Sequence, residues 1–495
     1  MIVPALFLLT TSISLWPKAL SHTVSFGSDQ PIVGTYFFYW YDIHTKGHFL
    51  NHDGTDALVD HPTNPNDYSY NSVNWWKREL HDVISAKVDF ILPVYWGIPN
   101  RQNDPKFHDA WSFSGLPKLV EAWDQIAGQG NHPPPRIGMF YDTSTLELNP
   151  DRFHVDLTTS EGKQWFYETI RDFFSLVPPR TWAMIDQKPI IFLYSASFAK
   201  KQDPEIFDYV RRNFKTDFTC EPFIVKEISW HGDADATYAW GGAVSPRWND
   251  VTALGPGYDH HAVPGREPLV VDRENGDFYK RVWRSLLAQH PTRRSRIVTI
   301  ETWNELHEGT DICDTIEYGG EYIDLTAKFA DQFRSGDQIP IDGKFSSAES
   351  VSWSEGLSSG INITEVDDGL FETVEVNGVS AIKSKKNKTG GRYVYFRIDD
   401  SFLFDQEIPV TIELAYLDGG CTQIELNYDS SDTNGSVRDG AFKFGGQRKI
   451  DDSREWKTTE FSVKDGRFIN RCNGADFRFA VTAGNLTVKQ VKVAK

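Results

Sequence analysis

Apolar and polar residues follow two different patterns along this 495-residue chain, and the change falls near residue 340. Before it, continuous apolar runs alternate with stretches whose apolar residues recur every three or four positions. Such runs are typical of parallel strands covered on both faces, and the spaced pattern is typical of helices. The expected strands are Ile32–Tyr39, Val88–Tyr95, Ile137–Tyr141, Ile190–Tyr194, Phe218–Val225, Ala236–Val244 and Ile297–Trp303. The expected helices are Trp75–Ala86, Leu116–Ala127, Glu161–Leu176, Pro204–Asn213, Phe278–Gln289 and Tyr322–Arg334.

This alternation of strand and helix over about 300 residues predicts an α/β fold, a (β/α)8 TIM-type barrel covering residues 22–338. We expect the missing eighth strand within residues 240–260. After the short polar linker Ser335–Asp342 the pattern changes to short alternating strands separated by Gly, Asn and Asp. That pattern predicts an all-β sandwich, jelly-roll-like, over residues 345–495. Its expected strands are Tyr393–Ile398, Val410–Leu417, Gln423–Asp429, Lys457–Val463, Phe477–Ala483 and Val488–Val493.

The N-terminal residues 1–21 have the pattern of a secretory signal. An uncharged apolar run, residues 2–15, precedes small residues at positions 19 and 21, which suits cleavage near His22. A run of about 14 residues is too short to span a bilayer. We therefore expect a secreted, extracellular protein with no membrane attachment after cleavage.

Cysteines and glycosylation motifs fit an exported chain. The four cysteines, Cys220, Cys313, Cys421 and Cys472, allow three pairings, of which we favour 220–313 and 421–472. Four buried free thiols are the alternative. Four Asn-X-Ser/Thr motifs begin at residues 362, 387, 434 and 485, all beyond residue 340, and they predict a glycosylated sandwich.

Composition narrows the class of ligand. The 51 Lys and Arg residues against 69 Asp and Glu give a net charge of −18, which argues against binding to nucleic acids or anionic membranes. Aromatic residues make up 14% of the chain. Aromatic side chains without excess positive charge suit a ligand with flat apolar faces and many hydroxyls, which favours sugars.

The most informative segment follows the last barrel strand and reads Trp303-Asn304-Glu305-Leu306-His307-Glu308-Gly309-Thr310. Side chains at the C-terminal ends of barrel strands face the active site. Glycoside hydrolysis needs one carboxylic acid that protonates the leaving oxygen and one carboxylate on the other side of the bond. The paired glutamates therefore predict a catalytic site, and a solvated loop with incidental acids is the alternative.

This segment resembles the motif W/F-N-E-W-H-E-G-T of glycoside hydrolase family 99, and Leu306 departs from it. The chain looks closest to a branch described as domain of unknown function 5010, in which a similar barrel carries a C-terminal β-sandwich. The resemblance implies a retaining enzyme in which Glu305 acts as a base on the sugar's 2-hydroxyl. A 1,2-anhydro sugar forms, and Glu308 acts first as acid and then as base.

Aromatic and polar residues near other strand ends complete a predicted saccharide cleft. The candidate substrate-binding residues are Tyr36, Tyr39, Trp40, Tyr95, Trp96, Asp142, Tyr194, Trp248, Tyr258, Asp259, His260, Trp303, Asn304 and His307. Packing inside the barrel is the alternative for Tyr36. We expect no cofactor and no metal, because His260 and His261 have no third ligand at a suitable spacing.

These observations favour a secreted endo-acting glycosidase whose partner is a polysaccharide or glycan. A non-catalytic carbohydrate-binding protein on a barrel scaffold is the alternative, and a polysaccharide lyase is less favoured because no Arg-rich segment is present to neutralise a uronate. The sandwich has an equal claim to carbohydrate binding and to a structural role, with Tyr393, Tyr416, Tyr428 and Trp456 as candidate contacts.

Overall fold

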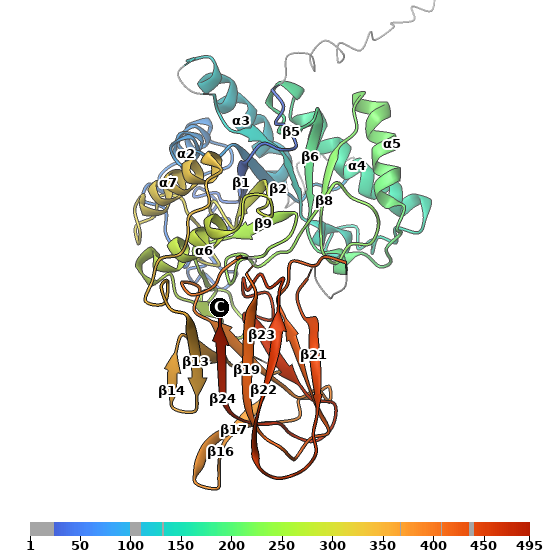
Figure 1. The fold of residues 1–495 in the computed structure, drawn as a ribbon. Helices are drawn as coiled ribbons and strands as arrows, with labels where there is room; N and C mark the ends of the chain where they lie inside the picture. The colour runs from blue at the N-terminus through green and yellow to red at the C-terminus, as the bar shows by residue number, and fades with distance from the viewer. Residues whose placement is uncertain (1–23, 100–109, 131–132, 367, 407, 435–439) are drawn as a thin grey trace, which may run out of the picture. The chain divides into compact units, whose positions relative to one another are not determined.

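The computed structural model describes residues 24–99, 110–130, 133–366, 368–406, 408–434 and 440–495. The signal segment expected at residues 1–21 lies outside the described residues. The chain divides into two compact units (Figure 1). Unit 1 runs up to Trp283 and includes Ser295–Gly336, and unit 2 comprises Arg284–Arg294 and Asp337–Lys495. The boundary near residue 340 therefore agrees with the change in sequence pattern, except that unit 2 also takes one short segment from the first region.

The ten-stranded sheet of unit 1 contains a parallel path of eight strands in the order β8-β7-β6-β4-β2-β1-β12-β9, as expected for a near-closed (β/α)8 barrel. Two short strands lie off this path: β3 (Arg136–Ile137) pairs with β2, and β5 (Met184–Ile185) pairs with β6. The strands are β1 (Ile32–Phe37), β2 (Phe90–Tyr95), β4 (Met139–Tyr141), β6 (Lys188–Leu193), β7 (Phe223–Glu227), β8 (Ala236–Tyr238), β9 (Val251–Leu254) and β12 (Ile297–Ile300). The α-helices of the described chain are α2 (Val73–Ser85), α3 (Ala110–Ala127), α4 (Ser160–Leu176), α5 (Ile206–Phe218), α6 (Asp277–Ala288) and α7 (Glu321–Ser335). This arrangement confirms the predicted fold class.

Two details of the strand prediction are settled by this topology. The eighth strand is β9, which lies within residues 240–260 as expected and pairs with β12. The expected strand Phe218–Val225 begins too early, because Phe218 is the last residue of α5 and β7 starts at Phe223. Thr219 ends that helix with a φ of 66°, so the chain turns before it can extend.

The barrel interior is filled largely by aromatic side chains. Tyr36 on β1 lies 4.7 Å from Phe140 and 4.9 Å from Trp240 between ring centroids, and its hydroxyl donates to Thr299 Oγ1 at 3.4 Å. Beside it on β1, Gly34 is required by close packing, since a Cβ there would meet the Phe90 ring at 2.2 Å. Layers of large side chains of this kind make the barrel a packed core rather than a pore.

β8 and β9, the two ends of the barrel sheet, are not paired by a backbone ladder in the described chain. The chain between these two strands folds back on β9. Arg247 and Ala253 exchange both backbone hydrogen bonds, at 2.8 and 3.1 Å. The Glu301 carboxylate, following β12, accepts the backbone N–H groups of Gly241 and Ala243 at 3.0 and 3.4 Å. Burial raises the pKa of Glu301 to about 8, although these N–H groups favour its ionised form. We call Glu301 and residues 239–253 the seam.

Unit 2 contains two antiparallel sheets, which confirms the predicted sandwich. One sheet contains β13 (Ser350–Ser354), β14 (Leu357–Ser359), β16 (Phe371–Val376), β17 (Val379–Ser384), β19 (Val410–Leu417), β22 (Trp456–Val463) and β24 (Thr487–Ala494). The other contains β15 (Ile361–Thr364), β18 (Tyr393–Ile398), β20 (Gln423–Tyr428), β21 (Lys443–Lys449) and β23 (Phe477–Ala480). Alternate residues of β19 and β20 are buried, as a sheet with one core-facing side requires.

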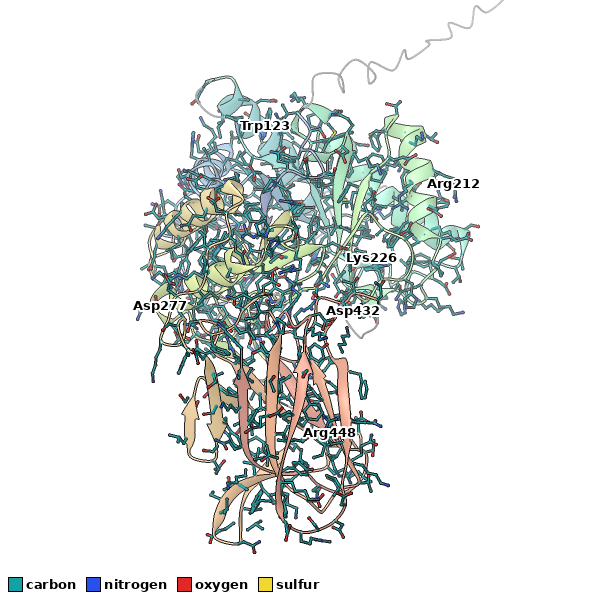
Figure 2. The ribbon with its side chains drawn as sticks, in the orientation of Figure 1. Trp123, Arg212, Lys226, Asp277, Asp432 and Arg448 are labelled. Atoms are coloured by element: carbon teal, nitrogen blue, oxygen red, sulfur yellow. The ribbon has the colours of Figure 1, made fainter. Side chains whose placement is uncertain are left out.

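Two of the four residues proposed as carbohydrate contacts in the sandwich are buried in its core. Tyr416 and Tyr428 belong to the buried apolar cluster, each about 5% exposed, so they pack between the sheets rather than contact a ligand. Arg448 of β21, labelled in Figure 2, is exposed. Its guanidinium lies 4.9 Å from the Phe461 ring centroid. Only Tyr393 and Trp456 of that set retain intermediate exposure.

Both predicted disulfides are wrong, because all four cysteines are free. Cys220 precedes β7, at the N-terminal end of a barrel strand, whereas Cys313 follows β12, at the opposite end of the barrel. In the sandwich, Cys421 forms an isolated backbone β-bridge with Gly484, and Cys472 forms one with Ala475. The ladder between β20 and β23 separates these two backbone bridges, so Cys421 and Cys472 lie toward opposite ends of it and do not form a disulfide.

The structure also bears on the expected glycosylation of the sandwich and on membrane-spanning helices. Asn387, in one of the four glycosylation motifs, is buried: its amide donates to the Asp368 carbonyl at 3.1 Å and its oxygen accepts from Thr389. Because this side chain is buried, the folded chain leaves little room for a glycan on it, so that motif is unsuitable for modification after folding. Among the described residues, no helix combines the length and the apolar character needed to cross a bilayer.

Candidate active site

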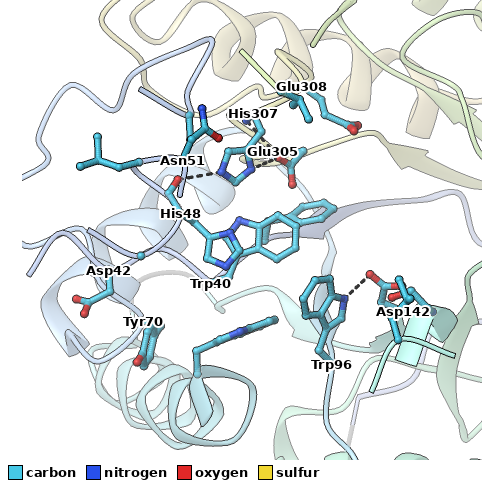
Figure 3. Close-up of a pocket in the computed structure, with 18 of the residues that line it drawn as sticks. Trp40, Asp42, His48, Asn51, Tyr70, Trp96, Asp142, Glu305, His307 and Glu308 are labelled. Atoms are coloured by element: carbon cyan, nitrogen blue, oxygen red, sulfur yellow. Dashed lines mark hydrogen bonds and ion pairs between the residues drawn. The ribbon is translucent and has the colours of Figure 1, made fainter. Parts of the chain in front are cut away.

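A cleft of about 730 Å³ opens at the carboxyl ends of the barrel strands. Its walls come from the loops that follow six different strands, and they include Trp40 after β1, Trp96 after β2, Asp142 after β4, Tyr194 after β6, Trp240 after β8 and Glu305 after β12. The cleft is therefore built where a (β/α)8 barrel places its active site. Figure 3 shows the aromatic floor and the acidic residues around it.

Glu305 is the most deeply buried acid of this cleft, at 4% exposure. Its Oε1 lies 2.7 Å from His307 Nδ1 and accepts the backbone N–H of His307 at 3.2 Å. Its Oε2 is buried and has no hydrogen-bond partner in the described chain. Because an unsatisfied buried oxygen is costly, Oε2 is suited to accept a hydrogen bond from a bound ligand.

The electrostatics of Glu305 and His307 are linked. Burial raises the pKa of Glu305, while the charge and hydrogen bond of His307 act in the opposite direction. Burial lowers the pKa of His307, but the attraction of Glu305 outweighs it, so the pKa of His307 is raised overall. The protonation state of each group therefore depends on that of the other.

Glu308, the second acid, has a different environment. Its carboxylate is about 21% exposed and forms an ion pair with Arg266, which lies between strands β10 (Tyr258–Asp259) and β11 (Val270–Val271). Arg266 also contacts the Tyr258 hydroxyl at 3.4 Å. The backbone carbonyl of Glu308 accepts the Asp259 N–H at 2.9 Å, so the two loops are joined beside the cleft. The two glutamates thus occupy one cleft with unlike partners.

A buried ion-pair cluster fixes the loop that carries both glutamates. The Arg273 guanidinium donates to Asp60 at 2.9 Å and to the Asp311 carboxylate and carbonyl at 3.2 and 2.9 Å. All three side chains are 7% exposed or less. The Arg273 guanidinium also lies over the rings of Tyr318 and Tyr322, at 4.3 and 4.7 Å. These contacts position the chain directly after Glu308.

Asp142 and Trp96 form the opposite part of the cleft. Trp96 Nε1 donates to Asp142 Oδ2, and the Ser144 N–H donates to Oδ1 at 3.0 Å. Burial raises the pKa of Asp142. Burial likewise raises the pKa of Tyr194 to about 12, so its hydroxyl remains a hydrogen-bond donor at neutral pH. These residues provide hydroxyl-binding groups beside aromatic faces.

The cleft brings together seven of the residues proposed from sequence: Trp40, Trp96, Asp142, Tyr194, Glu305, His307 and Glu308. Five others are buried away from its lining. Tyr36 packs in the barrel interior, and Tyr95 is fully buried; the Tyr39 hydroxyl donates to the Ser112 carbonyl. Trp303 Nε1 donates to Glu79, and the Asn304 amide pairs with both backbone groups of Phe38. These five act as structural residues.

The remaining proposed residues lie near the cleft rather than on its walls. Tyr258 and His260 contact each other at 3.0 Å, and His260 Nε2 donates to the Glu267 carbonyl at 2.6 Å. Asp259 pairs with His261. Trp248 is of intermediate exposure and is not among the cleft residues. No group of three His, Cys, Asp or Glu residues in the described chain is arranged to hold a metal ion.

The cleft residues that sequence reasoning missed include His48, Trp111, Trp240 and Arg266. Trp240 carried a usable signal, because it follows a strand end in the aromatic and glycine-rich run after Tyr238. Trp111 lies in the first turn of α3, and Arg266 and His48 lie in loops. Nothing in their sequence surroundings separates them from ordinary surface residues.

The chain belongs to the family described as "Domain of unknown function (DUF5010)", whose model matches residues 18–344. This agrees with the resemblance inferred from the motif at residues 303–310. The matched region spans the barrel and ends close to the start of the sandwich. No curated protein matches the sequence.

Several solved structures are similar to parts of the chain. A glycoside hydrolase family 99 endo-α-mannosidase from Bacteroides thetaiotaomicron is 15% identical over 62% of this chain and 98% of its own, with a TM-score of 0.46. An α-fucosidase from Thermotoga maritima is 12% identical over 94% and 99%, with a TM-score of 0.35. A family 29 carbohydrate-binding module from Piromyces equi is 11% identical over 30% and 93%, with a TM-score of 0.21. At such scores these likenesses support no assignment of activity.

Proposed function

We propose that the protein is a retaining glycoside hydrolase that cleaves within a polysaccharide or glycan. One observation carries the proposal: the buried Oε2 of Glu305 has no hydrogen-bond partner among the described residues, and Glu305 lines an aromatic cleft that also contains Glu308. A sugar hydroxyl is a donor that would satisfy this oxygen. The Trp40 and Trp96 rings, whose planes meet at 69°, line the cleft and offer aromatic surface to the C–H faces of the sugar ring.

In this proposal Glu305 is the base and Glu308 the acid. Glu305 takes the proton of the sugar's 2-hydroxyl, the 2-oxygen bonds to the anomeric carbon, and the glycosidic bond breaks as Glu308 protonates the leaving oxygen. Water then gives a proton to Glu308 and its oxygen bonds to the anomeric carbon. The bond between the 2-oxygen and that carbon breaks, and the 2-oxygen regains its proton from Glu305. Two displacements retain the anomeric configuration.

The Arg266–Glu308 ion pair bears on the acid step. A neighbouring guanidinium attracts the negatively charged form of a carboxyl group, whereas a general acid must carry a proton. Arg266 is about half exposed and lies on a loop, so substrate entry can displace it from Glu308. The same ion pair favours the second candidate function, a carbohydrate-binding protein in which Glu308 never donates a proton.

Release of reducing ends from a panel of polysaccharides and glycans tests the proposal. Glu305→Gln and Glu308→Gln should each lower kcat by about 10²–10⁴, the range for loss of general acid–base catalysis. Glu267→Gln, on the same loop as Arg266 but exposed and outside the cleft, is the matched control and should leave kcat unchanged. Binding of a glycan without turnover by the unmodified protein would establish the non-catalytic alternative instead.

A further inference from the structure

The loop that follows β1 contains a closed turn that ends beside the proposed base. The Asp42 carboxylate accepts from Thr45 Oγ1 at 2.7 Å and from the Thr45 N–H at 3.3 Å, and the Asp42 N–H donates to the Gly47 carbonyl at 3.0 Å. Lys46 and His48 both adopt left-handed backbone conformations, with φ of 64° and 61°. The turn directs the carbonyl of His48 toward His307 Nε2, 2.9 Å away (Figure 3).

This carbonyl determines where His307 carries its hydrogen. A carbonyl oxygen can only accept, so Nε2 must be protonated to make the bond. Nδ1 then faces Glu305 Oε1 at 2.7 Å, and a hydrogen must lie between them for that contact to be favourable. If the hydrogen is on Nδ1, the pair is an imidazolium and a carboxylate. If it is on Oε1, Glu305 is neutral and is no base.

We propose that His307 is a positioning residue that carries a proton on both ring nitrogens, keeps Glu305 ionised inside the barrel mouth, and leaves Oε2 as its single reactive oxygen. The inference rests on the proposed function, because it assigns the chemical state of the proposed base. Two contacts support it, the His48 carbonyl on Nε2 and Oε1 on Nδ1, together with the absence of a hydrogen-bond partner for Oε2 among the described residues.

The surroundings of His307 are compatible with a positive charge. Glu305 and Glu308 are the acids that face it, and both attract a proton to the ring. The Tyr41 ring stacks on His307 with centroids 5.4 Å apart, and the Trp40 ring lies at 5.6 Å. Aromatic faces carry negative charge density that favours a cation. The His48 ring lies 5.6 Å from the His307 ring, and the His48 backbone carbonyl favours a proton on His307.

A titration of the histidine ring signals by NMR tests the inference without any substrate. In the unmodified protein His307 should titrate above 6.5, the usual histidine pKa, and Glu305→Gln should lower its pKa, because only the His48 carbonyl and Glu308 then oppose the effect of burial. Glu317→Gln is the control: Glu317 pairs with the more exposed His61, so it should lower the pKa of His61 and leave His307 unchanged. A His307 pKa that is at or below 6.5, or that does not respond to Glu305→Gln, would overturn the inference.

Kinetics of His307→Gln separate charge from geometry. Glutamine can still donate a hydrogen bond to Glu305 but carries no charge, so kcat/KM should fall at least tenfold and its acidic limb should move to higher pH. The shift is upward because the positive charge that favours ionised Glu305 has been lost. An unchanged pH profile would show that the charge of His307 has no effect on Glu305 and would overturn the inference. A protein without glycosidase activity but with the expected NMR titration would refute the proposed function and leave the ion pair standing.

Discussion

Single charged side chains hold the candidate catalytic loop in place. Arg273 is buried and is compensated by two carboxylates, Asp60 and Asp311, and by two tyrosine rings. Removing one member of such a cluster leaves an uncompensated buried charge, which costs far more than the net value of the intact pair. The order of the loop that carries Glu305 and Glu308 therefore depends on a residue outside the cleft.

Arg273→Met should lower the free energy of unfolding by about 3–5 kcal/mol, since Asp60 and Asp311 would be left as buried acids without their cation. Urea denaturation followed by circular dichroism measures this change. Arg281→Met is the matched control, because the Arg281–Glu274 pair is about half exposed on both sides and solvent screens it, so its loss should have a much smaller effect. Equal effects of the two substitutions would contradict the role assigned to the buried cluster.

Sequence located the reactive residues of this loop but not the orientation of their neighbours. The strand end and the acidic motif place Glu305, His307 and Glu308 at the cleft. Trp303 and Asn304, in the same motif, turn inward because Asn304 pairs with the backbone of Phe38, 266 positions away. A partner so distant in sequence leaves no local pattern, so the direction of these two side chains could not be predicted.

At the scale of elements, the seam shows how one carboxylate replaces part of a strand ladder. Glu301 holds Gly241 and Ala243 where β8 and β9 have no backbone pairing, and it thereby supports Trp240 in the cleft. Both glycines of this segment are needed for geometric reasons. Gly241 has a φ of 104°, which residues with a side chain rarely adopt. At Gly242, an added Cβ would lie 2.5 Å from the Ala253 carbonyl carbon.

Glu301 also makes stability depend on pH. Its pKa rises from 4.5 in the unfolded chain to about 8 in the folded one, so the folded state binds the proton more tightly. The resulting stabilisation is complete below pH 4.5 and is lost as the pH rises through 8, a change of about 3 kcal/mol between pH 5 and 8. Glu301→Gln should reduce the pH dependence of the unfolding free energy by that amount, as measured by urea denaturation at a series of pH values.

The exposed Glu267→Gln variant should keep the original pH dependence and serves as the control. An identical dependence in Glu301→Gln would mean that the seam carboxylate is not buried in solution. A glutamine side-chain oxygen can still accept both N–H groups, so a loss of fold is not expected to obscure the comparison.

Regular elements were predicted where apolar periodicity is strong. The apolar runs of β1, β2 and β6 and the amphipathic helices α2 and α4 are all present. The strands β14 and β16 were missed because most of their residues are exposed, so no apolar alternation marks them. Register and topology fix such strands, and neither leaves a trace in local sequence.

The whole molecule is two compact units whose stability does not involve covalent cross-links between cysteines. All four thiols are free, and Cys313 and Cys472 are buried. The two units are stabilised by packing of the barrel and sandwich cores and by buried ion pairs such as Asp429–Arg471. The disulfide expectation failed because cysteine positions along a chain do not report which end of a strand each residue occupies.

Four thiols should therefore react with a thiol reagent in denaturant, with or without prior reduction. In the native protein at pH 8 the reaction should be slow, because burial raises the pKa of Cys220 and Cys421 to about 11 and little thiolate is present. The midpoint of thermal unfolding should be the same with and without reductant. Fewer than four thiols in the unreduced, denatured protein would show that cross-links form.

The composition of the cleft has an optical consequence. Four of the sixteen tryptophans, at positions 40, 96, 111 and 240, line it, while Trp75, Trp76, Trp182, Trp230, Trp283 and Trp303 are fully buried. A ligand entering the cleft changes the solvent around the first set and leaves the buried set untouched. Intrinsic fluorescence therefore reports occupancy directly, so that binding of candidate glycans can be followed by emission quenching before any turnover is detected.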